Sequence, residues 1–193
     1  MLAHVITNAL QERARADTSL ATASLGDEVH ERVRRIYYVR QQLNAEPSMQ
    51  RRVRMVADQV RRTIGFDRAM LFMPEEGRLT LRSSYPAGAE GAIDIESDLF
   101  ESEAFRTRHG VSVEQVDGRS PRLPSYEGLT SYVVVPVVRD DRSIGVLVGG
   151  FTGDRKVQAS DLQLLQIFAG NVRAALDERA GDIEPPPGFA AGA

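Results

Sequence analysis

The residues that could carry out chemistry are few, and the three histidines are the first to consider. They are His4, His30 and His109, and the sequence contains no cysteine. The lack of cysteine excludes disulfides, thiolate zinc sites, a cysteine nucleophile and a cofactor tethered through a thioether. No group of histidine, aspartate and glutamate residues has the spacing of a metal site. These residues therefore form no active-site constellation that we would defend and no metal site, and they identify no cofactor.

Of the three histidines, only His4 has a recognisable motif around it. It is followed by Asn8, Leu10 and Gln11, and this arrangement resembles the phosphoacceptor box of one class of histidine kinases. Phosphotransfer on His4 would need an exposed imidazole and a carboxylate or kinase domain to activate it. The basic residues inside that box are replaced at residues 5–7. A phosphoacceptor at His4 is therefore an alternative hypothesis, and a degenerate hairpin kept for dimerisation explains the pattern more simply.

The composition is that of an ordinary globular protein. The 193 residues are 42% hydrophobic and 26% charged, and the formal net charge is −3. No apolar run approaches the roughly 20 residues that span a bilayer, and the N-terminus lacks the apolar region of a signal peptide. Because the net charge gives no reason to expect an anionic partner, we expect a cytoplasmic protein that binds neither membranes nor nucleic acid.

The elements that would position functional residues are organised around residues 131–151. Two runs rich in valine and isoleucine, Tyr132–Val138 and Ser143–Phe151, flank a polar break at residues 139–142. β-branched residues fit a pleated sheet, and a short charged break between two such runs is typical of a hairpin. Because both runs are almost entirely apolar, we expect both faces of this hairpin to be covered. The hairpin should therefore lie in the centre of a sheet.

Amphipathic helices are predicted before and after this hairpin. The later one begins at residues 160–163, where a serine followed three residues on by glutamine forms a capping-box pattern. The earlier one spans about residues 48–64 and ends at Gly65, since glycine is the usual residue just past a helix. Residues 68–73 and 79–84 form a second predicted hairpin. A short helix is predicted at residues 98–108, with Leu99, Phe100, Ala104 and Phe105 on its apolar side.

The two ends of the chain differ from this central part. Residues 1–46 are predicted to form a helical hairpin, and the second helix carries an apolar stripe. Short helices need a partner to bury such a stripe, and pairing of two copies into a four-helix bundle would supply one. Residues 181–193 contain three consecutive prolines and small residues, which is typical of a flexible tail. The stripe consists of Val29, Val33, Ile36, Tyr37 and Leu43.

Several short motifs follow one another in a specific order and spacing. They are Phe66–Phe72, Ala104–Thr107 with Gly110, Asp117, Ser131–Val137 running into Ile144–Leu147, and Ser160–Leu165 with Phe168-Ala169. Together they resemble a GAF domain over about residues 48–179. The resemblance implies an α+β fold in which terminal helices pack on one face of an antiparallel sheet and a small-molecule pocket forms on the other. We therefore predict three parts: the helical hairpin (1–46), a GAF domain (47–180) and the tail (181–193).

If this pocket exists, the sheet face opposite the terminal helices should line it, with residues 85–130 as a lid. Simple alternation along residues 79–84 places Leu79 and Leu81 toward the helices and Arg82 toward the pocket, where it could meet an anionic ligand. Aromatic residues would form the walls, although they could instead be ordinary core. The predicted pocket residues are Arg82, Tyr85, Phe105, Tyr126 and Tyr132.

The resemblance implies a sensory or regulatory module that binds a small molecule or a partner protein in bacterial-type signalling or transcriptional control. Such a module would dimerise through its helices. Two alternatives remain: a phosphorelay or kinase-associated protein that uses the N-terminal hairpin, and a ligand-free GAF scaffold for dimerisation and docking.

Overall fold

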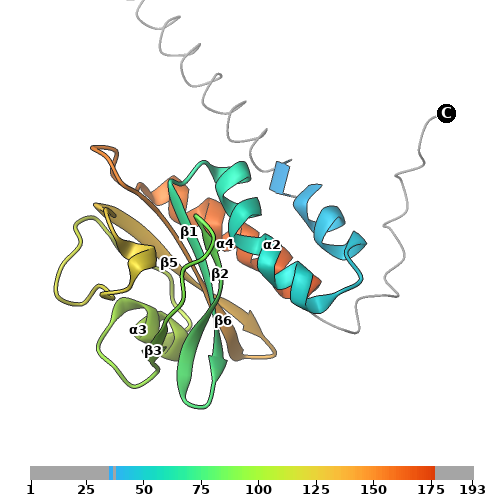
Figure 1. Ribbon diagram of the computed structural model, residues 1–193, viewed down its shortest axis with the longest axis horizontal. Helices are drawn as coiled ribbons and strands as arrows, with labels where there is room; N and C mark the ends of the chain where they lie inside the picture. Colours follow the sequence, from blue (N-terminus) through green and yellow to red (C-terminus); the bar gives the residue numbers. More distant parts are fainter. Residues whose placement is uncertain (1–34, 37, 177–193) are drawn as a thin grey trace, which may run out of the picture.

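The structure, a computed structural model, describes residues 35–36 and 38–176 (Figure 1). One six-stranded antiparallel sheet with the strand order β3-β2-β1-β6-β5-β4 runs through it. The fold is therefore α+β, as predicted. The strands are β1 (Arg68–Glu75), β2 (Arg78–Tyr85), β3 (Ala92–Asp94), β4 (Val111–Val113), β5 (Ser131–Arg139) and β6 (Arg142–Phe151), and the helices are α2 (Met49–Ile64), α3 (Phe100–Thr107), the 3₁₀ turn η1 (Pro124–Tyr126) and α4 (Ala159–Ala175).

The predicted valine-rich hairpin is formed by β5 and β6 and lies at the heart of the sheet. β6 is paired with β1 on one side and with β5 on the other. Both faces of the hairpin are buried, as its apolar sequence predicts. On β5, Val133 and Val135 pack toward one face, whereas Tyr132 and Val134 pack toward the other. The sheet thus separates two apolar cores, and each core has its own cover.

Helices α2 and α4 cover the first face (Figure 1). The sequence signals for both ends of α2 are confirmed. The Ser48 side chain accepts a hydrogen bond from the Arg51 backbone N–H, and Gly65 ends the helix in a left-handed conformation with φ 91°. The predicted start of α4 is wrong. Its N-cap is Gln158, because the buried Asp161 carboxylate accepts the Gln158 backbone N–H at 2.9 Å and closes the capping box there.

Helical residues 38–45 pack against α2 and α4 (Figure 1). The side chains of Ile36, Val39 and Leu43 are buried in the same core as those helices, and the Asn171 side chain of α4 donates a hydrogen bond to the Ile36 carbonyl at 2.9 Å. Part of the predicted stripe is therefore covered within the chain. Its members Val29, Val33 and Tyr37 lie outside the described residues, so the pairing of two copies stays a prediction.

The second face is covered by α3 and by the segment of residues 114–130, which contains η1 (Figure 1). The core beneath this cover includes Met70, Phe72, Tyr132, Val134 and Val146. In the part of the chain that the structure describes, we find no helix with the length and apolar character to cross a membrane.

The close fit of the first core predicts a stability effect at Gly149. Gly149 lies on β6 against the ring of Phe66, and a Cβ atom there would collide with that ring. We expect Gly149→Ala to lower the free energy of unfolding by about 1–3 kcal/mol, the usual cost of overpacking a core. Denaturant unfolding monitored by circular dichroism measures this change. The control Gly153→Ala, whose Cβ would meet nothing within 4 Å, should leave stability almost unchanged.

Candidate functional site around a buried glutamate

A β-bulge in β2 decides where the predicted pocket residues lie. β1 and β2 pair in register from Glu75 and Arg78 onward, but Phe72 pairs with Leu81 whereas the preceding residue, Leu71, pairs with Ser83. Arg82 is therefore the extra residue of the bulge. An extra residue breaks the two-residue alternation of a strand, so the side chains beyond it change face.

The prediction that Leu79 and Leu81 face the helices is wrong, because both faces of the sheet carry an apolar core and apolar character alone does not choose between them. Both pack on the opposite side of the sheet, in the core beneath α3. Past the bulge, Ser83 faces α2, where its hydroxyl donates to the Arg54 carbonyl at 2.8 Å. Tyr85 likewise packs on the helix side, beneath the Arg61 guanidinium, which lies 4.7 Å from its ring.

Arg82 and Tyr85 thus lie away from the second core. The Arg82 side chain is exposed at the bulge and forms an ion pair with Glu75 at 2.6 Å. The structure does bring the other three predicted residues together. Tyr126 and Tyr132 meet edge to face with ring centroids 5.5 Å apart, and Phe105, partly buried, packs against the same core.

At the centre of this group is a residue that the sequence reasoning missed, Glu101. It lies in the first turn of α3 and its side chain is fully buried. Its Oε1 atom accepts a hydrogen bond from the Tyr126 hydroxyl at 2.8 Å. A signal was present, because Glu101 precedes Ala104 by three residues and Phe105 by four and so shares their apolar face of the helix.

The hydrogen bonding of this cluster is incomplete. The Tyr132 hydroxyl donates to the Ser120 hydroxyl at 3.0 Å. The other carboxyl oxygen of Glu101, Oε2, has no partner, and neither does the Ser125 hydroxyl. Among the described residues these are the two buried side-chain oxygens without a hydrogen bond. Buried polar groups are nearly always paired, so each such atom marks a place where a donor would be stabilising.

Burial also sets the proton affinities of the cluster. Desolvation raises the pKa of Glu101 from 4.5 to about 7, and the hydrogen bond from Tyr126 opposes this shift. The pKa of both tyrosines is raised above 10. Burial is the larger cause, and the nearby Glu101 carboxylate is the second. Both phenols are therefore neutral hydrogen-bond donors at physiological pH, whereas Glu101 changes its charge near neutrality.

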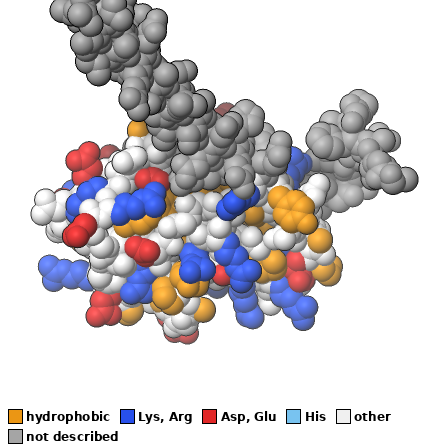
Figure 2. Space-filling model, turned by 90° about the horizontal axis from the view of Figure 1, so that it is seen from above, with side chains coloured by type: hydrophobic (Ala, Val, Ile, Leu, Met, Phe, Trp, Pro, Cys, Tyr) orange, Lys and Arg blue, Asp and Glu red, His pale blue; other side chains and the backbone are white. Residues whose placement is uncertain are grey.

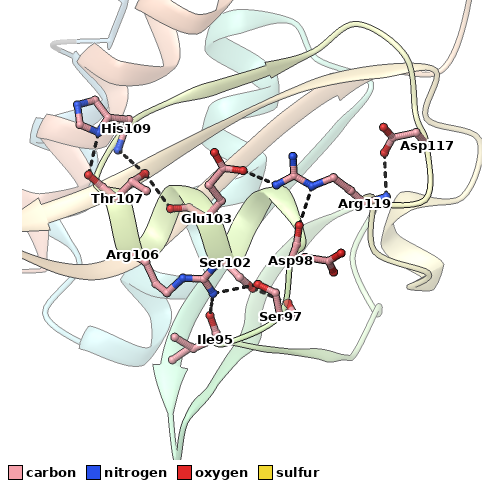
Figure 3. A network of polar contacts seen from close by, with 10 residues as sticks. All are labelled: Ile95, Ser97, Asp98, Ser102, Glu103, Arg106, Thr107, His109, Asp117 and Arg119. Atoms are coloured by element: carbon pink, nitrogen blue, oxygen red, sulfur yellow. Dashed lines mark hydrogen bonds and ion pairs between the residues drawn. The ribbon is translucent and has the colours of Figure 1, made fainter.

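The cover over this cluster is fastened at its outer surface, as Figure 3 shows. Arg119 joins the 114–130 segment to α3: its Nε donates to the Asp98 carbonyl at 2.8 Å, it pairs with the Glu103 carboxylate, and it lies 4.4 Å from the Phe100 ring. On the other side of α3, Arg106 donates to the Ile95 and Ser97 carbonyls. Exposed pairs of this kind each contribute little, so the apolar contacts of the cover with the sheet are its main attachment.

Of the three histidines, the structure describes His109. His109 is exposed, and its Nδ1 lies 2.8 Å from the Thr107 carbonyl (Figure 3). His4 lies outside the described residues. Within the described ranges, no group of three or more histidine, aspartate or glutamate side chains is placed to hold a metal ion.

Comparison with known proteins identifies the family. The family model described as GAF domain matches residues 48–178, and the chain therefore belongs to the GAF domain family. The comparison with curated proteins gave no match.

Solved structures share the fold. The GAF domain of a phosphoenolpyruvate-protein phosphotransferase from Acinetobacter is 17% identical, with 74% of this chain and 90% of that chain covered and a TM-score of 0.64. A segment of a methyl-accepting chemotaxis protein is 15% identical, with coverage of 72% and 94% and a TM-score of 0.59. The second GAF domain of DevS from Mycobacterium smegmatis is 25% identical, with coverage of 66% and 92% and a TM-score of 0.54.

The raised pKa of Glu101 predicts how stability depends on pH. Between pH 4.5 and pH 7 the folded protein holds a proton on Glu101 that the unfolded chain releases, so stability falls as pH rises through this window. The total loss is about 3 kcal/mol. Glu101→Gln retains an oxygen that can accept the hydrogen bond from Tyr126, but its side chain cannot ionise. We therefore expect the free energy of unfolding of this variant to fall by about 3 kcal/mol less than that of the wild type over the same pH window.

Denaturant unfolding at half-unit steps from pH 5 to pH 8 gives this difference. The control is Glu114→Gln, which removes the same charge from an exposed position of the cover. Parallel pH profiles for Glu101→Gln and the wild-type protein would contradict the assignment of a neutral, buried carboxyl.

Proposed function

We propose that this protein is a non-catalytic sensory or regulatory module that binds a small molecule between the sheet and the cover formed by α3 and residues 114–130. One observation carries this proposal: the Oε2 atom of Glu101 is buried in an aromatic core and has no hydrogen-bond partner. A stable core has little reason to retain a carboxyl group in this state. A ligand that donates a hydrogen bond to Oε2 would satisfy the ionised carboxyl, the form that prevails above about pH 7.

The chemistry of the cluster defines the ligand that fits. Glu101 and Ser125 offer acceptor oxygens, and the surrounding rings offer flat apolar surface. The ligand would therefore be a small, largely apolar molecule with an N–H or O–H donor. A protonated amine would hold Glu101 in its ionised form, because an opposite charge lowers the pKa of a carboxyl. An anionic ligand fits poorly, since the predicted anion-binding Arg82 is paired with Glu75 outside this core.

Ligand entry would require the cover to move. Glu101 is fully buried, so no path leads to it while the 114–130 segment is closed. The fastening contacts of Arg119 and Arg106 lie at the surface, and their exchange for water would open the cover. Movement of the cover on binding is also a means of signalling, since it would change the surface that a partner protein meets.

The relatives support a sensory role. The structural neighbours include a domain of a methyl-accepting chemotaxis protein and the second GAF domain of DevS. Figure 2 shows that arginine and acidic side chains are interspersed on one face of the molecule, so no continuous basic patch covers that face. A small molecule or a partner protein is therefore the better-supported partner, in line with the sequence prediction.

Native mass spectrometry of the protein as purified from cells tests the proposal first, and a thermal-shift screen with a library of aromatic amines, amides and phenols follows. We expect a retained mass or a stabilising compound. Binding by Glu101→Gln should be at least about tenfold weaker, because a hydrogen bond to a charged group is lost.

The control Glu114→Gln should bind like the wild type. No adduct and no stabilising compound would favour the ligand-free scaffold, and equal binding by Glu101→Gln would remove Glu101 from the site.

A further inference from the structure

A second candidate site lies at the edge of the sheet, and none of its lining residues belongs to the Glu101 cluster. It is a shallow groove of about 230 Å³ between β5, the second half of α4 and the turn that joins α3 to β4. Its floor is apolar, and two arginines line it. The lining residues are Arg108, Gly110, Val135, Pro136, Val138, Gln166, Ala169, Gly170 and Arg173.

The groove exists because two elements leave space there. β4 pairs with only Tyr132, Val133 and Val134 of β5, whereas β5 continues to Arg139. On α4, Ala169 and Gly170 present almost no side chain toward the space, and a Cβ atom on Gly170 would meet nothing within 4 Å. The four α4 residues of the groove are spaced by three and four, so they share one face of the helix.

The charge of the groove has one sign. Of the lining residues that the structure describes, Arg108 and Arg173 are charged and none is acidic. Among the described residues Arg173 has no ion pair or hydrogen bond from its side chain. Arg108 uses one guanidinium nitrogen to donate to the Asp141 carbonyl at 2.7 Å. Its remaining guanidinium N–H groups have no hydrogen bond among the described residues. Two such guanidinium groups beside an apolar floor are complementary to carboxylates that flank an apolar side chain.

The shape of the groove favours a peptide over the other possible occupants. It is too open and too small to enclose most of a typical ligand, which needs about 300–1,000 Å³. An added β-strand is disfavoured, because Pro136 has no N–H to donate at the open edge of β5. We propose that this groove docks an acidic segment of a partner protein, with carboxylates on Arg108 and Arg173 and an apolar side chain on Pro136 and Ala169.

The test uses the full-length, ¹⁵N-labelled protein and the blocked peptide acetyl-Glu-Leu-Glu-Leu-Glu-amide, titrated to millimolar concentration. We expect amide shifts at residues 108–110, 135–138 and 166–173. The Arg173→Gln variant should bind about tenfold more weakly. Gly170→Leu should abolish binding by filling the groove, while leucine strengthens the helix relative to glycine and so keeps the fold.

Two controls make the outcome decisive. Arg51→Gln removes an exposed arginine of α2 that is not part of the groove, and it should bind the peptide like the wild type. The same peptide with glutamine in place of each glutamate should not bind. The proposal is overturned if no shifts occur, if the glutamine peptide gives the same shifts, or if Gly170→Leu binds unchanged. A failure of ligand binding at Glu101 would leave this result interpretable, because the two sites share no residue.

Discussion

Because both faces of the central sheet are covered, the middle of β1, β5 and β6 has no solvent side on which a charged group can lie. Those strands are accordingly apolar on both faces. The constraint extends to the covers, which must fit closely: Gly149 has no side chain because Phe66 fills that place. Most polar groups of the candidate site therefore come from the covering segments, where Glu101, Ser120 and Ser125 lie, and β5 adds the Tyr132 hydroxyl.

The two covers differ in kind, and the difference suits a sensor. The helical cover is apolar and continuous, and it reaches from α2 and α4 to Ile36 and Leu43. The opposite cover contains a short helix, a 3₁₀ turn and loops, and surface arginines fasten it over a polar cluster. Opening it would break few buried apolar contacts compared with opening the helical cover. If the proposed function holds, a ligand-dependent change is expected on one side of the sheet, while the other side keeps the fold.

Much of the fold could be predicted from sequence, because the signals are local. The valine-rich runs predicted a central hairpin, and the Ser48 and Gly65 signals predicted both ends of α2. The errors are also local. Leu79 and Leu81, which precede the bulge, were assigned to the helix face although they pack in the second core, and past the bulge at Arg82 the predicted pocket residue Tyr85 lies on the helix side. Of the predicted pocket residues, Phe105, Tyr126 and Tyr132 lie in one core, and Glu101 at its centre was missed.

The sequence by itself determined the order of helices and strands, the family motifs and the absence of cysteine chemistry, since periodicity and composition are properties of the chain. Only the tertiary structure decided that Glu101 is buried. Its helix face is apolar in sequence, but the desolvation of its carboxyl depends on Tyr126 and Tyr132, which lie many residues later and reach it only when the cover folds onto the sheet. The same holds for the groove beside Arg173, which is formed by the point at which β4 stops pairing with β5.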